Sequence, residues 1–171
     1  MHPFGTASPP LAHPEPVALK DVINRSSSSG SSGPQRTPAL INLAGIRVLL
    51  VDDDPEQLQL VAELLTAANA EVATAATVGA AIRQLAERVP DVLVSDIGMP
   101  DCDGYHFLRM VRARSPQDGG STPAIALTGN ATTEDQSRAA LAGYQVHLAK
   151  PLRLIELLVA INSLVAERRA R

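Results

Sequence analysis

After residue 45, segments with the spacing of apolar residues typical of strands alternate with segments that have the spacing typical of helices. Short apolar runs rich in β-branched residues predict strands, and apolar residues at three- and four-residue spacing predict the helices between them. The predicted strands are 47–51, 71–75, 92–94, 124–127 and 146–149. The predicted helices begin at Pro55, cover 80–88, 104–114 and 133–142, and end the chain with an apolar stripe from Leu154 to Val165.

This alternation predicts an α/β fold in which a parallel sheet is covered by helices on both faces. The crossovers between parallel strands are expected to be right-handed. In such sheets the functional groups gather at the carboxyl ends of the strands. Polar residues that directly follow a strand are therefore the first candidates for a site.

Residues 1–44 show neither the strand spacing nor the helix spacing of apolar residues. Residues 1–44 contain seven prolines, and residues 26–33 are entirely serine and glycine. Such a composition buries too little apolar surface to offset the entropy of ordering the chain. We therefore expect a disordered linker over 1–44, with at most a short helix over 17–23, and one folded domain over 45–171.

Composition narrows the class of protein. The chain has 171 residues, of which 45% are hydrophobic and 19% charged, as is ordinary for a globular protein. No apolar run approaches the roughly 20 residues of a membrane span, and the first residues do not resemble a secretory signal. The single cysteine, Cys102, fits a reducing cytoplasm. A net charge of −3 gives no electrostatic case for nucleic acid. We expect a cytoplasmic protein that binds neither membranes nor nucleic acid.

Acidic residues follow two of the predicted strands. Asp52, Asp53 and Asp54 come after the first strand, and Asp96 comes after the third. Carboxylates packed together repel unless a cation joins them, and Mg²⁺ is the usual ion for oxygen ligands near phosphate. The alternative is an acidic N-cap on the next helix, a role we assign to Asp54 because Pro55 follows it.

Asp96, Thr128 and Lys150 are the candidates for chemistry at the same edge of the sheet. A carboxylate can attack phosphorus to give an acyl phosphate, while a lysine and a metal ion neutralise the phosphoryl oxygens. The hydroxyl of Thr128 adds a donor. The alternatives are a loop aspartate satisfied by nearby N–H groups and a threonine that is only a strand residue.

Four segments in this order and spacing resemble the receiver domains of two-component response regulators: 48–55, 92–104, 126–129 and 147–151. The resemblance covers about residues 45–168 and is greatest to receivers attached to hybrid sensor histidine kinases. It implies a flavodoxin-like (βα)5 doubly wound fold with strand order 2-1-3-4-5. The chain is then either a stand-alone receiver or a piece of a longer protein.

The resemblance also implies roles for individual residues. Asp96 would be the phosphoacceptor, Lys150 would hold the phosphoryl group and Thr128 would move toward it. His147 departs from the family, because it stands where a switching aromatic residue is usual. It either takes part in switching or stays at the surface in both states.

A Mg²⁺ ion and a protein partner are implied in the same way. Asp53 would bind the ion directly and Asp52 mainly through water, with Asp96 and the backbone carbonyl of Gly98 completing the site. The phosphoryl group would come from a sensor histidine kinase or a histidine phosphotransfer protein, and the downstream target is unknown. Such a domain is not an enzyme beyond its own phosphorylation and dephosphorylation.

Other functions fit the sequence less well. A phosphatase of the haloacid dehalogenase type would use the aspartates at 52–54, but it needs a further acidic pair after the lysine, and only Glu156 and Glu167 follow, both in the last helix. A degenerate receiver that only binds proteins would lack groups that are present here. A dinucleotide-binding domain would need a glycine-rich turn after the first strand. Cys102 is expected to be a plain loop residue, and His106 to lie on a helix surface.

Overall fold

The computed structural model describes residues 41–100, 103–129 and 132–171. Within these residues five strands alternate with five helices, as the periods predicted. In chain order they are β1 (Arg47–Val51), α2 (Pro55–Ala67), β2 (Glu71–Ala75), α3 (Val78–Glu87), β3 (Val92–Asp96), α4 (Gly104–Arg112), β4 (Ala124–Thr128), α5 (Thr133–Ala142), β5 (Val146–Ala149) and α6 (Leu154–Arg169).

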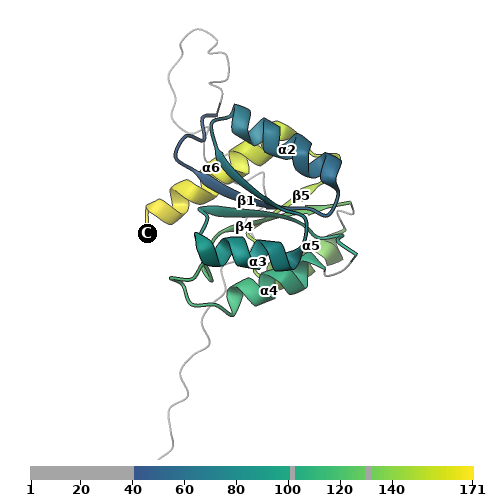
Figure 1. The fold of residues 1–171 in the computed structure, drawn as a ribbon. Helices are drawn as coiled ribbons and strands as arrows, with labels where there is room; N and C mark the ends of the chain where they lie inside the picture. Colours follow the sequence, from purple (N-terminus) through teal and green to yellow (C-terminus); the bar gives the residue numbers. More distant parts are fainter. Residues whose placement is uncertain (1–40, 101–102, 130–131) are drawn as a thin grey trace, which may run out of the picture.

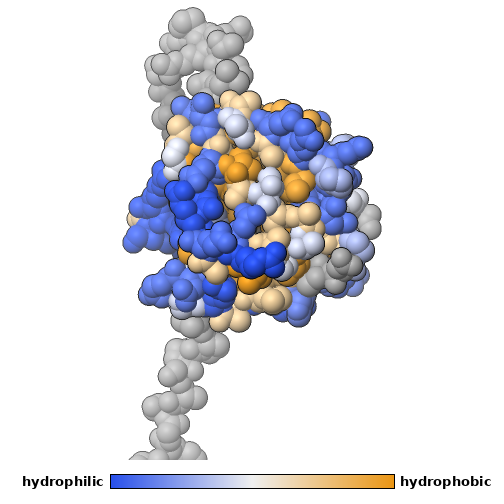
Figure 2. All heavy atoms as spheres, in the orientation of Figure 1, coloured by the Kyte–Doolittle hydropathy of each residue, from blue (hydrophilic) through white to orange (hydrophobic). Residues whose placement is uncertain are grey.

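The strands form one parallel sheet in the order β2-β1-β3-β4-β5, which confirms the predicted flavodoxin-like fold. Helices α2 and α6 cover one face of the sheet, and α3, α4 and α5 cover the other (Figure 1). In the view of Figure 2, hydrophilic residues gather at the rim of the molecule and apolar residues lie nearer its centre. No helix in the described ranges is both long and apolar enough to cross a bilayer.

Two hydrophobic cores lie on opposite faces of the sheet, because successive residues of a strand point to opposite sides. On β1, Val48 and Leu50 join the core under α2 and α6, whereas Leu49 and Val51 join the core under α3, α4 and α5. The three central strands are covered on both faces, which explains why they read as continuous apolar runs. These strands hold the site at their carboxyl ends.

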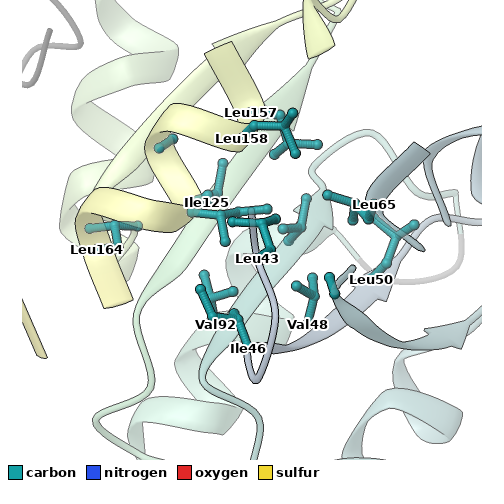
Figure 3. Close-up of a cluster of buried hydrophobic side chains, with 14 of the residues drawn as sticks. Leu43, Ile46, Val48, Leu50, Leu65, Val92, Ile125, Leu157, Leu158 and Leu164 are labelled. Carbon is teal, nitrogen blue, oxygen red and sulfur yellow. The ribbon is translucent and has the colours of Figure 1, made fainter. Parts of the chain in front are cut away.

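The folded unit begins earlier than the sequence indicated. Leu43 was assigned to the linker, but it is 0% exposed and its N–H donates to the carbonyl of Ala68 at 2.8 Å. Figure 3 shows it among the side chains of the first core, with Ile125 close by. Burying a leucine contributes about 1.5–3 kcal/mol, so the last residues of 1–44 stabilise the domain. Residues 1–40 lie outside the described ranges, and their disorder stays a prediction.

Several element boundaries also differ from the expected ones, and β3 and β4 run on to Asp96 and Thr128. Helix α3 begins at Val78 instead of residue 80, because the side chain of Thr77 accepts the N–H of Ala80 and caps the helix. Helix α4 ends at Arg112 instead of residue 114.

Candidate metal and phosphoryl-transfer site

Strand register brings the predicted site residues together. Val51 of β1 pairs with Ser95 of β3, so the residues that follow them, Asp52 and Asp96, emerge side by side. On the other side of β3, Thr128 ends β4 and pairs with Ala149 of β5. Lys150 directly follows β5, and its N–H donates to the Thr128 carbonyl at 2.7 Å. The groups predicted from three separate motifs therefore meet at one edge of the sheet.

Three carboxylates form a cluster at this edge. Asp52, Asp53 and Asp96 each offer an oxygen atom, and these oxygens lie within 4.8 Å of one another. Asp52 is 3% exposed and Asp96 is 6% exposed, whereas Asp53 is open to solvent. Three carboxylate oxygens at this spacing, one of them accessible, fit a hard divalent cation that keeps part of its water shell. The donor set therefore fits the expected Mg²⁺.

Lys150 reaches into the carboxylate cluster from β5. Its Nζ lies 3.2 Å from Asp96 Oδ1 and 3.4 Å from Asp52 Oδ2, and its side chain is 22% exposed. One cation thus bridges two buried anions. An ammonium group in this position can exchange a carboxylate for a phosphoryl oxygen without moving far.

Burial dominates the electrostatics of Asp52. It raises the pKa of this carboxyl above its usual value, and the neighbouring charge of Asp96 raises it further. The N–H of Asp54, which donates to Asp52 Oδ1 at 2.9 Å, and the charge of Lys150 oppose that rise. The repulsion between carboxylates that predicted a cation is therefore present in the structure.

Asp54 has the separate role that the sequence assigned to it. Its side chain accepts the N–H groups of Glu56 and Gln57 and caps α2. The side chain of Gln57 also donates to it at 2.9 Å, and this bond is the main reason why the pKa of Asp54 is lowered. Asp54 is thus a structural residue beside the carboxylate cluster.

Gly98 and a second glycine lie against Asp96. A Cβ added to Gly98 would lie 3.5 Å from Asp96 Oδ2, so this position is next to the Asp96 carboxylate. Gly104, which sequence reasoning missed, lies closer still: a Cβ there would be 2.5 Å from the carbonyl oxygen of Asp96. The hydroxyl of Tyr144 donates to the Gly104 carbonyl at 2.8 Å and holds α4 in this position. The pair of Asp103 and Gly104 at the start of a helix was the only sequence signal for this contact.

His147 lies on the face of β5 opposite to Val146 and Leu148. Those two residues belong to the core under α2 and α6, so the imidazole is directed toward the α5 side of the sheet. The ring is half-buried, and its Nε2 has no hydrogen-bond partner within the described part of the chain. Burial lowers the pKa of His147, and the charge of Asp135 on α5 opposes this. His147 is thus only partly accessible, and whether it takes part in switching stays a prediction.

The remaining candidates lie away from the chemistry. His106 is exposed on α4, and Cys102 lies outside the described residues. Tyr105, Phe107 and Tyr144 are buried in the core under α3, α4 and α5.

Comparison with known proteins identifies the family. The sequence model described as the response regulator receiver domain matches residues 48–162. A 14.6 kDa protein of Leptolyngbya boryana is 37% identical over 116 residues, which cover 68% of this chain and 87% of that protein. Hybrid signal transduction histidine kinase D of Dictyostelium discoideum is 33% identical over 129 residues, but this chain spans only 8% of it. It spans 51% of the transcriptional regulatory protein PrrA of Mycobacterium tuberculosis, at 34% identity.

Solved structures agree with these relatives. Chemotaxis protein CheY4 of Vibrio cholerae superimposes with a TM-score of 0.66 at 30% identity, covering 71% of this chain and 99% of that one. The receiver domain of sensor histidine kinase PA1611 from Pseudomonas aeruginosa, described with a magnesium ion in its active site cleft, gives a TM-score of 0.65 at 31% identity, covering 72% and 99%. The chain belongs to the receiver domain family of two-component response regulators.

Proposed function

We propose that this receiver domain accepts a phosphoryl group on Asp96 from a phosphohistidine of a sensor kinase or a phosphotransfer protein. The observation that carries the proposal is the convergence of Lys150 Nζ and the carboxylate cluster on one buried aspartate. The known relatives that include a hybrid histidine kinase and a transcriptional regulator support a role in a phosphorelay. Its place of action is then the cytoplasm.

The transfer is a single displacement at phosphorus, in which one bond forms and one bond breaks. A carboxylate oxygen of Asp96 forms the new O–P bond while the P–N bond to the donor imidazole breaks, and the electron pair of that bond returns to the ring nitrogen. Lys150 leaves its ion pairs with Asp96 and Asp52 and binds a phosphoryl oxygen instead. The Thr128 hydroxyl donates to another of these oxygens.

The acidic residues Asp52 and Asp53, together with Asp96 and the Gly98 carbonyl, are the proposed ligands of Mg²⁺. When bound there, the ion supplies positive charge beside the phosphoryl oxygens. The protein itself orients the acceptor: Asp52 and Asp96 are nearly buried, so their side chains have little freedom to turn away. The domain would promote its own phosphorylation and dephosphorylation and no other reaction.

His147 is the proposed site of the response. A phosphoryl group on Asp96 adds roughly two negative charges at the end of β3, and β4 lies between that strand and β5, which carries the imidazole. The Nε2 atom of His147 is buried and has no hydrogen-bond partner in the described residues. A rearrangement that supplied such a partner would therefore lower the free energy of the domain. We infer that the ring changes its environment when Asp96 is phosphorylated, which would alter the α5 surface that a downstream protein meets.

The proposal is tested with acetyl phosphate and Mg²⁺, followed by intact mass. Wild type should gain one phosphoryl group, and Asp96→Asn should gain none. Asp54→Asn is the matched control, because this acid is adjacent in sequence but caps α2, and it should still be labelled. Labelling that persists in Asp96→Asn would contradict the assignment of Asp96 as the phosphoacceptor. Steady turnover of a generic phosphomonoester by wild type would favour the phosphatase alternative instead.

A further inference from the structure

A pocket of about 210 Å³ opens beside the carboxylate cluster, on the side away from Lys150. The loop after β2 and the start of α3 form one wall, and the loop after β3 forms the other. Asp53 lies at its edge, and the remaining lining residues are Ala76, Thr77, Val78, Gly79, Met99 and Pro100.

The lining of this pocket is chemically unlike the site next to it. Ala76, Val78, Met99 and Pro100 present apolar surface, and the side chain of Thr77 is engaged as the cap of α3. An apolar cavity of about 150 Å³ is large enough to bind benzene. The pocket therefore has the size and the surface to hold one leucine, methionine or phenylalanine side chain.

Its distance from Asp96 suggests which molecule supplies that side chain. The Asp53 oxygen at the pocket edge lies within 4.8 Å of the Asp96 oxygen. A protein that brings a phosphohistidine in line with Asp96 must therefore cover Asp53. Residues three or four positions apart on a helix have Cβ atoms about 5–6 Å apart. A donor helix that holds its histidine above Asp96 and runs toward the loop after β2 would carry a neighbouring turn over the pocket.

We propose that this pocket receives an apolar side chain one helical turn from the phosphohistidine of the donor protein. The proposal rests on the proposed function, since it concerns how the donor of that phosphoryl group is recognised. The mouth of the pocket is open, because Ala76, Thr77, Gly79 and Pro100 are all exposed. Small acyl phosphates have no such side chain, so they react without using the pocket.

The test uses two synthetic helical peptides, each with a single phosphohistidine prepared with phosphoramidate. One peptide has leucine four residues before and after the histidine, and the other has alanine at both positions. Transfer to wild type, followed by intact mass at low peptide concentration, should be about tenfold faster from the leucine peptide, because only that peptide buries apolar surface in the pocket. Acetyl phosphate is the donor that should not depend on the pocket.

Two variants separate the pocket from the chemistry. Gly79→Leu places a side chain at the pocket, and a Cβ there meets only Arg83 Nη1 at 3.7 Å, an ordinary contact. Ala86→Leu adds a leucine to an exposed position of the same helix, outside the pocket. The preference for the leucine peptide should vanish in Gly79→Leu and persist in Ala86→Leu. Both variants should keep the wild-type melting temperature and the wild-type rate with acetyl phosphate.

The outcomes distinguish this proposal from the proposed function. Equal transfer from both peptides to wild type would overturn the pocket proposal, and so would a preference that survives in Gly79→Leu. Loss of labelling by acetyl phosphate in Gly79→Leu would also overturn it, because the pocket would then be part of the chemical site. If wild type took up no phosphoryl group from any donor, the proposed function itself would fail.

Discussion

Replacing Lys150 with methionine should destabilise the protein by about 3 kcal/mol in the absence of a divalent ion. The ammonium group lies 3.2 Å from Asp96 Oδ1 and 3.4 Å from Asp52 Oδ2. Each contact is worth about 5 kcal/mol at an effective dielectric constant of about 20, before desolvation is subtracted. Removal of one partner from a buried ion pair costs about 3–5 kcal/mol. The side chain of Lys150 is 22% exposed, so water screens part of the loss and the lower end applies.

Urea unfolding of wild type and Lys150→Met, in EDTA and in saturating Mg²⁺, measures this difference. The loss should shrink in Mg²⁺, because the ion neutralises the same carboxylates. It should also shrink when Asp52→Asn is combined with Lys150→Met, because one of the two anions is then removed.

Arg153→Met is the control for removal of an exposed cation. Arg153 pairs with Glu156 at 3.4 Å, but its side chain is 78% exposed, so this pair contributes at most about 1 kcal/mol. If Lys150→Met lost no more stability than Arg153→Met, or if its loss were the same with and without Mg²⁺, the reasoning about a bridging cation would be refuted.

Three further predictions follow from the same structure. Mg²⁺ should raise the melting temperature of wild type by mass action, and the rise should largely vanish in Asp53→Ala; an equal rise in both would place the ion elsewhere. Because the folded-state pKa of His147 is lowered, the unfolded chain binds more protons below about pH 6.5. Wild type should therefore lose stability as pH falls through that range and His147→Gln should lose less, whereas parallel urea curves would contradict this. Gly104→Ala should lose about 1–3 kcal/mol, since its Cβ would overlap the Asp96 carbonyl; unchanged urea stability would mean that α4 can move.

The elements of the fold were largely predictable because their signals are local. The apolar run from Arg47 to Val51 and the glycine after Ala142 mark where a strand and a helix end, and both ends agree with the structure. The start of α3 was misjudged because Thr77 caps the helix through its own side chain, without the acidic first turn that marks α2, α5 and α6. Leu43 was misjudged for a different reason: its burial depends on contacts with α2 and β4 that no neighbouring residue in the sequence reveals.

The site was predictable to the extent that it follows strand ends. The rule that parallel strands end at one edge of a sheet predicted that Asp52, Asp96 and Lys150 lie close together. In the structure Lys150 Nζ lies within 3.4 Å of an oxygen of each carboxylate. The contact of Gly104 with Asp96 was not predictable. It depends on how α4 packs on the sheet, and a helix position relative to a sheet is set by the whole core.

The backbone around the two buried acids explains why their repulsion persists. The N–H of Asp52 donates to the Ala75 carbonyl at 3.2 Å, and the N–H of Ile97, next to Asp96, donates to the Leu127 carbonyl at 2.9 Å. The backbone that carries each carboxylate is therefore bonded to a neighbouring strand, so neither backbone segment can shift without breaking hydrogen bonds of the sheet. Two hydrophobic cores hold that sheet in place. Lys150 already relieves part of this repulsion, and a metal ion or protonation would relieve more, so the rigidity that stabilises the fold also keeps the site ready to bind further positive charge.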